Sequence, residues 1–253
     1  MMQLKNKKAL ITGGSRGIGK AIALAFAREG IDIAISGRNE DALLKTAEEI
    51  QQYDVDCLVL RADMARDEEV IEAAQKALDF SPHWDILVNN AGIAKKVPLL
   101  ELEMKDWDEI MQVNLKSVLL LSQMMAKPMI KNKRGKIINI SSLGAFYGTP
   151  GMAAYAVSKA GLNQLTRTMA VEWGPHNIQA NAICPTVINT DMAKEIWDAP
   201  ENREMKKKFL EKIPAGRFGE PHDVADLALF LASDASDFIN GLSIPLEGGR
   251  MAN

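Results

Sequence analysis

The strongest constraint on the fold of this chain is an alternation between short apolar runs and longer stretches with helical periodicity. The runs show little polar alternation, which is typical of strands that are covered on both faces of a parallel sheet. Seven such strands are expected: Lys8–Thr12, Ile31–Ser36, Cys57–Arg61, Asp85–Asn89, Lys136–Ile140, Ile178–Ile183 and Leu242–Leu246.

Helical patterns separate these strands, and Asn39 is a suitable N-cap for a helix that continues to Gln51. The other expected helices are Gly19–Arg28, Met104–Met129, Met152–Trp173 and His222–Ser233. Strands that alternate with helices form βαβ units, so we expect an α/β fold of the Rossmann type, a doubly wound seven-stranded parallel sheet with helices on both faces. One such sheet accounts for all 253 residues, and the sequence therefore predicts a single domain over residues 1–253.

Composition excludes several classes of protein. A formal net charge of −3 argues against a nucleic-acid-binding surface, which is usually strongly basic. No apolar run approaches the roughly 18 residues of a membrane span, and the first twelve residues lack the apolar core of a signal peptide. Cys57 and Cys184 stand far apart without companions at metal-ligand spacing, so neither a disulfide scaffold nor a metal site is expected. These features predict a cytoplasmic protein.

A long segment at about residues 186–213 separates the sixth strand from the next helix. Its pattern predicts an amphipathic helix over Asp191–Leu210, with Trp197 as an anchor. Long insertions within compact domains are usually functional lids or disordered segments. We therefore expect a substrate lid, and a peripheral helix with a solvated lysine face is compatible with that role.

A glycine-rich turn joins the first strand to the first helix and runs from Gly13 through Gly17 to Gly19. Its glycines permit a tight turn and the close approach of a pyrophosphate to the helix N-terminus, where free N–H groups favour anions. An ordinary turn is the alternative for a glycine cluster taken alone. The position between a strand and a helix favours dinucleotide binding.

Tyr155 and Lys159 are four residues apart, which places them on one face of a helix. A phenol has a pKa of about 10, and a neighbouring ammonium lowers it towards the range useful for proton transfer. Ser142 follows the fifth strand and Asn90 the fourth, at the edge where ligands bind in open α/β sheets, and Asn114 lies in the helix between them. Helix capping or turn formation would explain any one of these residues. Neither explains well why all of them gather at one edge of the sheet.

Together these features resemble the pattern of the short-chain dehydrogenase/reductase family: the glycine turn, Asp63, Asn89-Asn90-Ala91-Gly92, Asn114, Ser142, Tyr155 and Lys159. The resemblance spans Lys7–Gly249, nearly the whole chain. It implies an oxidoreductase that transfers a hydride between a nicotinamide cofactor and a secondary alcohol or ketone, without a metal.

The resemblance also implies a role for each matching position. Tyr155 would be the general acid/base, Ser142 would hold the substrate oxygen, and Lys159 would lower the tyrosine pKa and bind the nicotinamide ribose. Asn114 would hold a water of the proton relay. The implied cofactor-binding residues are Gly13, Ser15, Arg16, Gly17, Ile18, Gly19, Arg38, Asp63, Met64, Asn90, Ala91, Gly92, Tyr155, Lys159, Pro185, Ile188 and Thr190. The expected substrate contacts are Ser142, Gly144, Tyr155 and Thr186. Further contacts are expected from the segments Leu143–Tyr147, Ile93–Lys95 and 185–210.

One position departs from the family pattern. Pro185-Thr186 stands where family members commonly have Pro-Gly, which predicts a stiffer loop and a more polar pocket. Cofactor binding should survive this change, because Ile188 and Thr190 stand where the family contacts the nicotinamide carboxamide.

The end of the second strand indicates which nicotinamide cofactor is used. A carboxylate there would bind the 2′-hydroxyl of NAD and repel a 2′-phosphate. The strand instead ends Ser36-Gly37-Arg38-Asn39, and Arg38 offers a planar fork of donors suited to phosphate, which Arg16 could also reach. A solvated arginine ahead of a helix is the alternative. NADP(H) is favoured, and NAD(H) remains open.

Several motifs favour a polyol, a ketose or a sugar acid as substrate. The stretches Cys184–Val187 and Ile213–Phe218, with Trp197 and Pro200, resemble the xylulose reductase and sugar-alcohol dehydrogenase branch. Gly37-Arg38-Asn39 resembles the pattern of gluconate 5-dehydrogenases.

Two other functions stay open. A 3-oxoacyl-[acyl-carrier-protein] reductase would dock its acidic partner on a basic loop, here Lys131, Lys133, Arg134 and Lys136, although cations are also common at a helix C-terminus. A non-catalytic nucleotide-binding scaffold is the second alternative, and the complete Ser/Tyr/Lys set argues against it. Family members commonly form homotetramers through the two long helices and the last strand, so we expect a homotetramer and neither a nucleic-acid nor a membrane partner.

Overall fold

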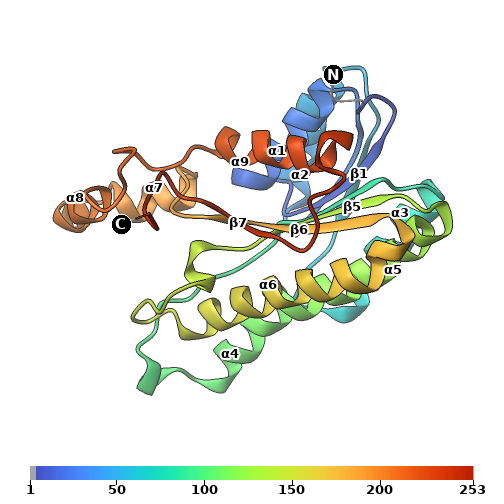
Figure 1. Cartoon of the computed structure of the whole chain (residues 1–253). Helices are drawn as coiled ribbons and strands as arrows, with labels where there is room; N and C mark the ends of the chain where they lie inside the picture. Colours follow the sequence, from blue (N-terminus) through green and yellow to red (C-terminus); the bar gives the residue numbers. More distant parts are fainter. Residues whose placement is uncertain (1–3, 253) are drawn as a thin grey trace.

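The computed structural model describes residues 4–252, apart from the side chains of Met192 and Ile196. Seven strands form one parallel sheet in the order β3-β2-β1-β4-β5-β6-β7 (Figure 1). Their bounds are β1 Lys8–Thr12, β2 Asp32–Gly37, β3 Cys57–Arg61, β4 Ile86–Asn89, β5 Gly135–Ile140, β6 Ile178–Pro185 and β7 Ser243–Leu246. The expected doubly wound α/β fold is confirmed, with strand ends that differ by no more than two residues.

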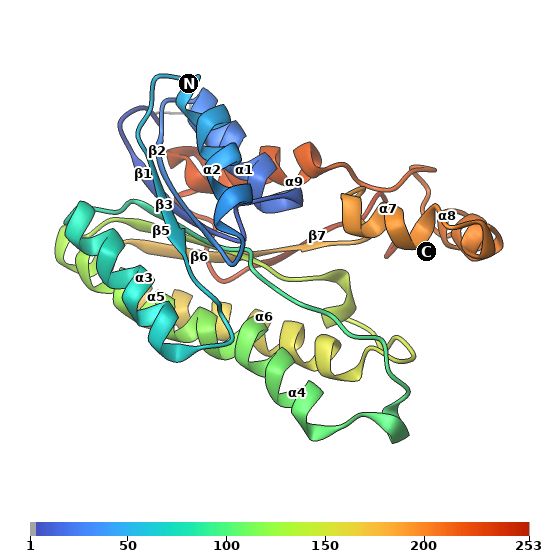
Figure 2. The same cartoon turned by 180° about the vertical axis from the view of Figure 1, so that it is seen from behind.

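Helices cover both faces of the sheet, as the two opposite views show (Figures 1 and 2). One face carries α1 Gly17–Arg28, α2 Glu40–Gln51 and α9 Pro221–Ala232. The other carries α3 Asp67–Phe80, α4 Met104–Met111, α5 Ser117–Asn132 and α6 Ala153–Trp173. Among the described residues, no helix has the length and apolar character needed to cross a membrane.

Two apolar cores lie on either side of the sheet because neighbouring residues of a strand point to opposite faces. Ile11 and its register partner Ile35 pack into the core below α1 and α9, together with Phe26. Leu10 and its partner Ala34 pack into the core on the α3 and α5 side. Burial on both faces explains why these strands read as continuous apolar runs.

The helix expected over Met104–Met129 is present, but it is interrupted and extends to Asn132. A single π-helical turn, Gln112–Lys116, separates α4 from α5. Such turns contain one residue more than an α-helical turn and are frequent at functional sites. Asn114, one of the predicted catalytic residues, lies in the middle of this turn.

The single helix predicted over Asp191–Leu210 is wrong. The segment forms α7 (Asp191–Trp197), a 3-10 turn (Pro200–Asn202) and α8 (Arg203–Leu210). Pro200 ends the first helix because proline disfavours the helical region at the preceding residue, and that residue has φ −61° and ψ 132°. Both helices project from the body of the molecule beside the C-terminus (Figures 1 and 2).

Three aromatic rings hold this segment together. The Trp197 ring centroid is 4.9 Å from that of Phe209 in α8 and 5.3 Å from that of Phe218. These contacts join α7 to α8 and to the chain that leads into α9. They support the anchor expected at Trp197.

Candidate active site

The chain between β1 and α1 makes the predicted glycine turn. Gly13 and Gly17 have φ of +68° and +56°, in the left-handed region that favours glycine. A Cβ at Gly19 would lie 2.3 Å from the carbonyl oxygen of Gly13, so this end of α1 packs directly against the turn. Arg16, at the N-cap, makes no side-chain capping bond. The N–H groups at the start of α1 are therefore available to an anion.

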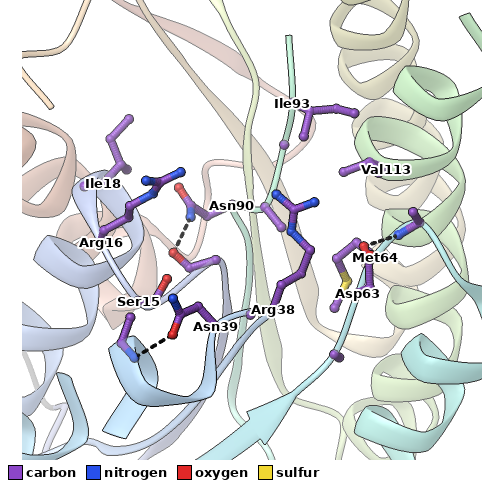
Figure 3. Close-up of a pocket in the computed structure, with 18 of the residues that line it drawn as sticks. Ser15, Arg16, Ile18, Arg38, Asn39, Asp63, Met64, Asn90, Ile93 and Val113 are labelled. Carbon is purple, nitrogen blue, oxygen red and sulfur yellow. Dashed lines mark hydrogen bonds between the residues drawn. The ribbon is translucent and has the colours of Figure 1, made fainter. Parts of the chain in front are cut away.

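A cavity of about 470 Å³ lies beside this turn (Figure 3). The predicted cofactor-binding residues that line it are Gly13, Ser15, Arg16, Gly17, Ile18, Arg38, Asp63, Met64, Asn90, Ala91, Gly92 and Thr190. Ile93, which was expected only as a substrate contact, lines the cavity as well. Sequence reasoning missed Gly37, Asn39, Ala42, Ala62, Ala65, Glu109, Val113 and Asp191 as lining residues. Most of these residues are direct sequence neighbours of a predicted residue, so the segments around the predicted positions already contain them. Glu109 and Val113 come from α4 and the π-helical turn, and no motif marks them.

Thr12 and Asn90 fix the two strand ends that border this cavity. The Thr12 hydroxyl accepts hydrogen bonds from the backbone N–H groups of Asn90 and Ala91, both at 3.0 Å. The Asn90 amide donates to the carbonyl oxygens of Thr12 and Gly13, at 2.9 and 3.3 Å. These bonds hold the glycine turn against the end of β4. The Asn90 side chain thus has a structural role beside its predicted contact with the cofactor.

Two arginines supply the positive charge of this cavity. Figure 3 shows the Arg16 side chain extending from the glycine turn and the Arg38 side chain from the end of β2. Within residues 4–252, no carboxylate forms an ion pair with either of them. A glycine cradle, a helix N-terminus and two free guanidinium groups fit a dinucleotide phosphate group.

Ser142 and Tyr155 meet at the carboxyl end of β5. Ser142 lies just after this strand, and its hydroxyl accepts a hydrogen bond of 3.1 Å from the backbone N–H of Gly144. Tyr155 lies near the start of α6. Burial raises the pKa of the Tyr155 phenol, and a hydrogen bond with Ser142 opposes that rise. A Cβ at Gly144 would lie 3.5 Å from Ser142 Oγ and 3.9 Å from Tyr155 Cε1, so these three predicted substrate contacts are neighbours.

Lys159 lies one turn further along α6 and is buried. Its Nζ donates a hydrogen bond of 2.8 Å to the carbonyl oxygen of Ile140 and lies 5.8 Å from the centroid of the Tyr155 ring. Desolvation lowers the pKa of Lys159 from 10.5 to about 8. A Cβ at Gly92 would meet Lys159 Nζ at 3.4 Å, which brings the predicted Asn90-Ala91-Gly92 motif next to this lysine. The lowering of the Tyr155 pKa by Lys159 stays a prediction.

Asn114 is fully buried, and its side chain is held at three points. Its Oδ1 accepts from the Ile93 N–H at 2.8 Å, and its Nδ2 donates to the Ile93 carbonyl at 2.9 Å and to Ser158 Oγ at 3.0 Å. Ser158 adjoins Lys159 on α6. The π-helical turn therefore joins α6 to the loop that follows β4, and the predicted relay water stays a prediction.

The remaining predicted residues follow β6, whose last residue is Pro185. Ile188 is buried and forms a bridge to Gly219, while Thr190 caps α7 by accepting from the Ala193 N–H at 3.3 Å. Thr186 lines a second cavity of about 380 Å³. Its hydroxyl accepts a hydrogen bond of 3.4 Å from Arg250 near the C-terminus. Sequence reasoning missed Arg250, which belongs to no motif.

The chain is similar to known proteins along nearly its whole length. The model of a family described as enoyl-(acyl carrier protein) reductase matches residues 13–250. A 3-oxoacyl-[acyl-carrier-protein] reductase from Thermotoga maritima is 41% identical over 251 residues, which cover 98% of this chain and 99% of that protein. A 2-dehydro-3-deoxy-D-gluconate 5-dehydrogenase from Escherichia coli is 40% identical over 250 residues, which cover 98% and 97%.

A solved structure adds a comparison of folds. A protein described as an NAD(P)-dependent gluconate 5-dehydrogenase from Beutenbergia cavernae contains bound NADP at low occupancy. It superposes on this chain with a TM-score of 0.93 at 33% identity, and the match covers 99% of each chain. Motifs, fold and relatives agree: the chain belongs to the short-chain dehydrogenase/reductase family and is an NAD(P)-dependent oxidoreductase.

Proposed function

We propose that the protein interconverts a secondary alcohol and a ketone on a sugar acid, a polyol or a ketose, with NADP(H) as the favoured cofactor. The observation that carries this proposal is the placement of Ser142 and Tyr155 side by side at the carboxyl end of β5, both next to Gly144, with Lys159 buried one helical turn further along α6. The gluconate 5-dehydrogenases among the relatives support a sugar acid in particular.

The chemistry divides between the cofactor and these side chains. The nicotinamide supplies or accepts the hydride when it is bound. Tyr155 donates its phenolic proton to the substrate oxygen during reduction and accepts it during oxidation. Ser142 donates a hydrogen bond to the same oxygen, which positions the reacting carbon. Lys159 is near enough to the phenol to stabilise its anion when its own amine is protonated.

The choice of NADP(H) rests on the cavity beside the glycine turn. Arg38 follows β2, where an NAD-specific site would carry an acid. Arg16 reaches the same space from the glycine turn, and both guanidinium groups lack ion-pair partners in the part of the chain that the structure describes. A 2′-phosphate would pair with these cations. NAD(H) has no negative group at that position, so it would gain less from them.

Reduction of a 3-oxoacyl thioester is the second candidate, because the Thermotoga maritima relative is as similar as the gluconate dehydrogenases. Two of the four basic residues of its expected docking loop form ion pairs within the chain. Arg134 pairs with Asp234 at 2.7 Å, and Lys136 pairs with Asp237 at 2.7 Å. The Lys136 side chain is only 7% exposed, so it belongs to the interior and not to a docking surface.

A substrate panel tests the proposed function. Oxidation of NADPH and of NADH would be followed by absorbance with ketoses, keto-sugar acids, α-diketones and acetoacetyl thioesters. We expect turnover of a ketose or keto acid with NADPH. Turnover of the thioester alone would replace the proposal by the second candidate, and no turnover at all would favour a nucleotide-binding scaffold. In the same assay Tyr155→Phe should abolish turnover while NADPH still binds, and an active variant would contradict the role of Tyr155.

We also propose a homotetramer that uses the long helices and the last strand. Val157 and Val171 of α6 are 45% and 76% exposed, and Leu242 before β7 is 50% exposed. Phe238, which lies near β7 in the sequence, is fully exposed. Apolar surface of this kind is typical of subunit contacts. Light scattering after size-exclusion chromatography tests the assembly, and a monomer would refute it.

A further inference from the structure

The C-terminal tail brings one arginine back to the end of β6. After β7 the chain turns at Gly248 and Gly249, whose φ values are +66° and +90°. The Gly248 carbonyl accepts a hydrogen bond of 3.0 Å from the Ala215 N–H, and a Cβ on Gly248 would lie 2.8 Å from the Ile213 side chain. The turn is therefore packed tightly against residues 213–215, at the end of the lid segment. Arg250 comes directly after it.

Arg250 contacts three segments of the chain: the loop that follows Ser142, helix α8 and the residue just after β6. Its guanidinium carbon lies 5.1 Å from the ring centroid of Tyr147, in the loop that follows Ser142. It lies 4.1 Å from the ring centroid of Phe209, in α8 of the lid segment. Its Nη1 donates to the Thr186 hydroxyl at 3.4 Å, just after β6. Contact with two aromatic rings orients the planar guanidinium and limits its contact with water.

The charge of Arg250 has no anionic partner among residues 4–252. Glu247, the acid closest to it in sequence, accepts a hydrogen bond from the Met251 N–H and makes no ion pair with Arg250. Arg217 is the contrasting case, because its two terminal nitrogens bind the Asp223 carboxylate at 2.7 and 3.0 Å. A guanidinium carries five N–H donors. The one long bond to Thr186 leaves most of those of Arg250 for a ligand.

We propose that Arg250 binds the carboxylate of the substrate and thereby sets the preference of the enzyme for anionic sugar derivatives. This inference rests on the proposed function and deepens it. The partly buried, oriented guanidinium suits a carboxylate that binds through both oxygens. A neutral polyol lacks such a group and would not use Arg250. The residue acts in substrate specificity and takes no part in proton or hydride transfer.

Kinetics with two substrate classes test the proposal. Arg250→Gln should lower kcat/KM for a keto-sugar acid about tenfold to a hundredfold, the range for a hydrogen-bonded charged group. This decrease should come from a higher KM. For a neutral ketose, kcat/KM should change less than threefold. For the keto-sugar acid, kcat/KM of Arg250→Lys should lie between the values of Arg250→Gln and of the wild type. Lysine keeps the positive charge but lacks the planar pair of donors that binds both carboxylate oxygens. Equal losses for both substrates would show that Arg250 only holds the lid and the tail, which overturns the proposal.

Arg28→Gln is the matched control. Arg28 also stacks on a tyrosine, with its guanidinium carbon 5.6 Å from the Tyr53 ring centroid, and it lies at the end of α1 away from the catalytic residues. This variant should keep wild-type kinetics with both substrates. A selective loss for the acid in Arg28→Gln as well would trace the effect to overall charge and overturn the proposal.

Competition separates failure of this inference from failure of the proposed function. Gluconate is added to the wild type and to Arg250→Gln while either enzyme reduces whichever neutral ketone or thioester the panel identifies. Competitive inhibition of the wild type that is at least tenfold weaker in the variant supports carboxylate binding by Arg250, even if the enzyme turns over no sugar acid. Equal inhibition of the two proteins, or none in the wild type, overturns it.

Discussion

Lys159 is a buried cation whose ionisation is coupled to folding, and its replacement by methionine isolates that coupling. The residue is 4% exposed, and its Nζ donates to the Ile140 carbonyl. Desolvation lowers its pKa from 10.5 to about 8, so folding at neutral pH has to bury an ammonium. At about 1.4 kcal/mol for each pH unit, this penalty is about 3 kcal/mol.

The direction of the pH dependence follows from the two pKa values. Below about pH 8 both states hold the proton, and the wild type carries the whole penalty. Between about pH 8 and 10.5 the unfolded chain still binds a proton that the folded state has released, so the wild type gains stability as the pH rises. Lys159→Met lacks this group. The free energy of unfolding of the variant minus that of the wild type should therefore fall by about 3 kcal/mol across this range.

Urea unfolding followed by circular dichroism measures this difference, from neutral pH to about pH 10.5. Both proteins are compared at one concentration, because the apparent stability of an oligomer depends on it. Loss of the hydrogen bond to Ile140 changes the free energy of unfolding by an amount that does not depend on pH. The change of the stability difference with pH is therefore the quantity that tests the reasoning. Lys194→Met, which removes an exposed lysine from α7, is the control. A constant difference between Lys159→Met and the wild type would refute the reasoning.

Three further predictions concern the cofactor and the lid. Arg38→Asp should raise the Kd for NADPH about tenfold to a hundredfold, measured by fluorescence titration, while NADH binding changes little; equal losses would contradict the role of Arg38. Gly19→Ala would place a Cβ 2.3 Å from the Gly13 carbonyl and should lower both thermal stability and NADPH binding. Gly148→Ala, with nothing within 4 Å, is its control and should change neither. Trp197→Ala removes the ring contacts with Phe209 and Phe218, which are worth about 1 kcal/mol each. Protease should then cut residues 191–210 faster and KM should rise, whereas unchanged cleavage would show that the rings do not hold the segment.

The sheet was predictable from the sequence because parallel strands are buried on both faces. Runs such as Ile86–Asn89 then contain hardly any polar residues, and the pattern marks them directly. The cluster of proposed catalytic residues follows from the same order of elements, since the carboxyl ends of parallel strands meet at one edge. The order of the strands alone therefore predicts that Ser142 after β5 and the Asn90 motif after β4 lie near each other.

The features that the sequence did not reveal have different physical causes. Pro200 was a local signal for a break that the amphipathic pattern of the segment concealed. The ion pairs of Arg134 and Lys136 were not predictable, because their partners lie 100 and 101 residues away and no spacing marks them. Arg250 escaped notice for the same reason: its importance comes from Tyr147, Phe209 and Thr186, which only the folded chain brings to it.

The π-helical turn at Gln112–Lys116 determines the direction in which each side chain of α5 points around the helix axis. One residue corresponds to about 100° around a helix axis, so the extra residue decides which side chains of α5 face the sheet. Leu121, Met125 and Met129, spaced by four, are buried in that interface. Deletion of one residue from the turn would restore a continuous α-helix and rotate these three towards solvent. The length of this short segment is thus constrained as tightly as the identity of Asn114, and insertions or deletions tolerated in the surface loops should be rejected here.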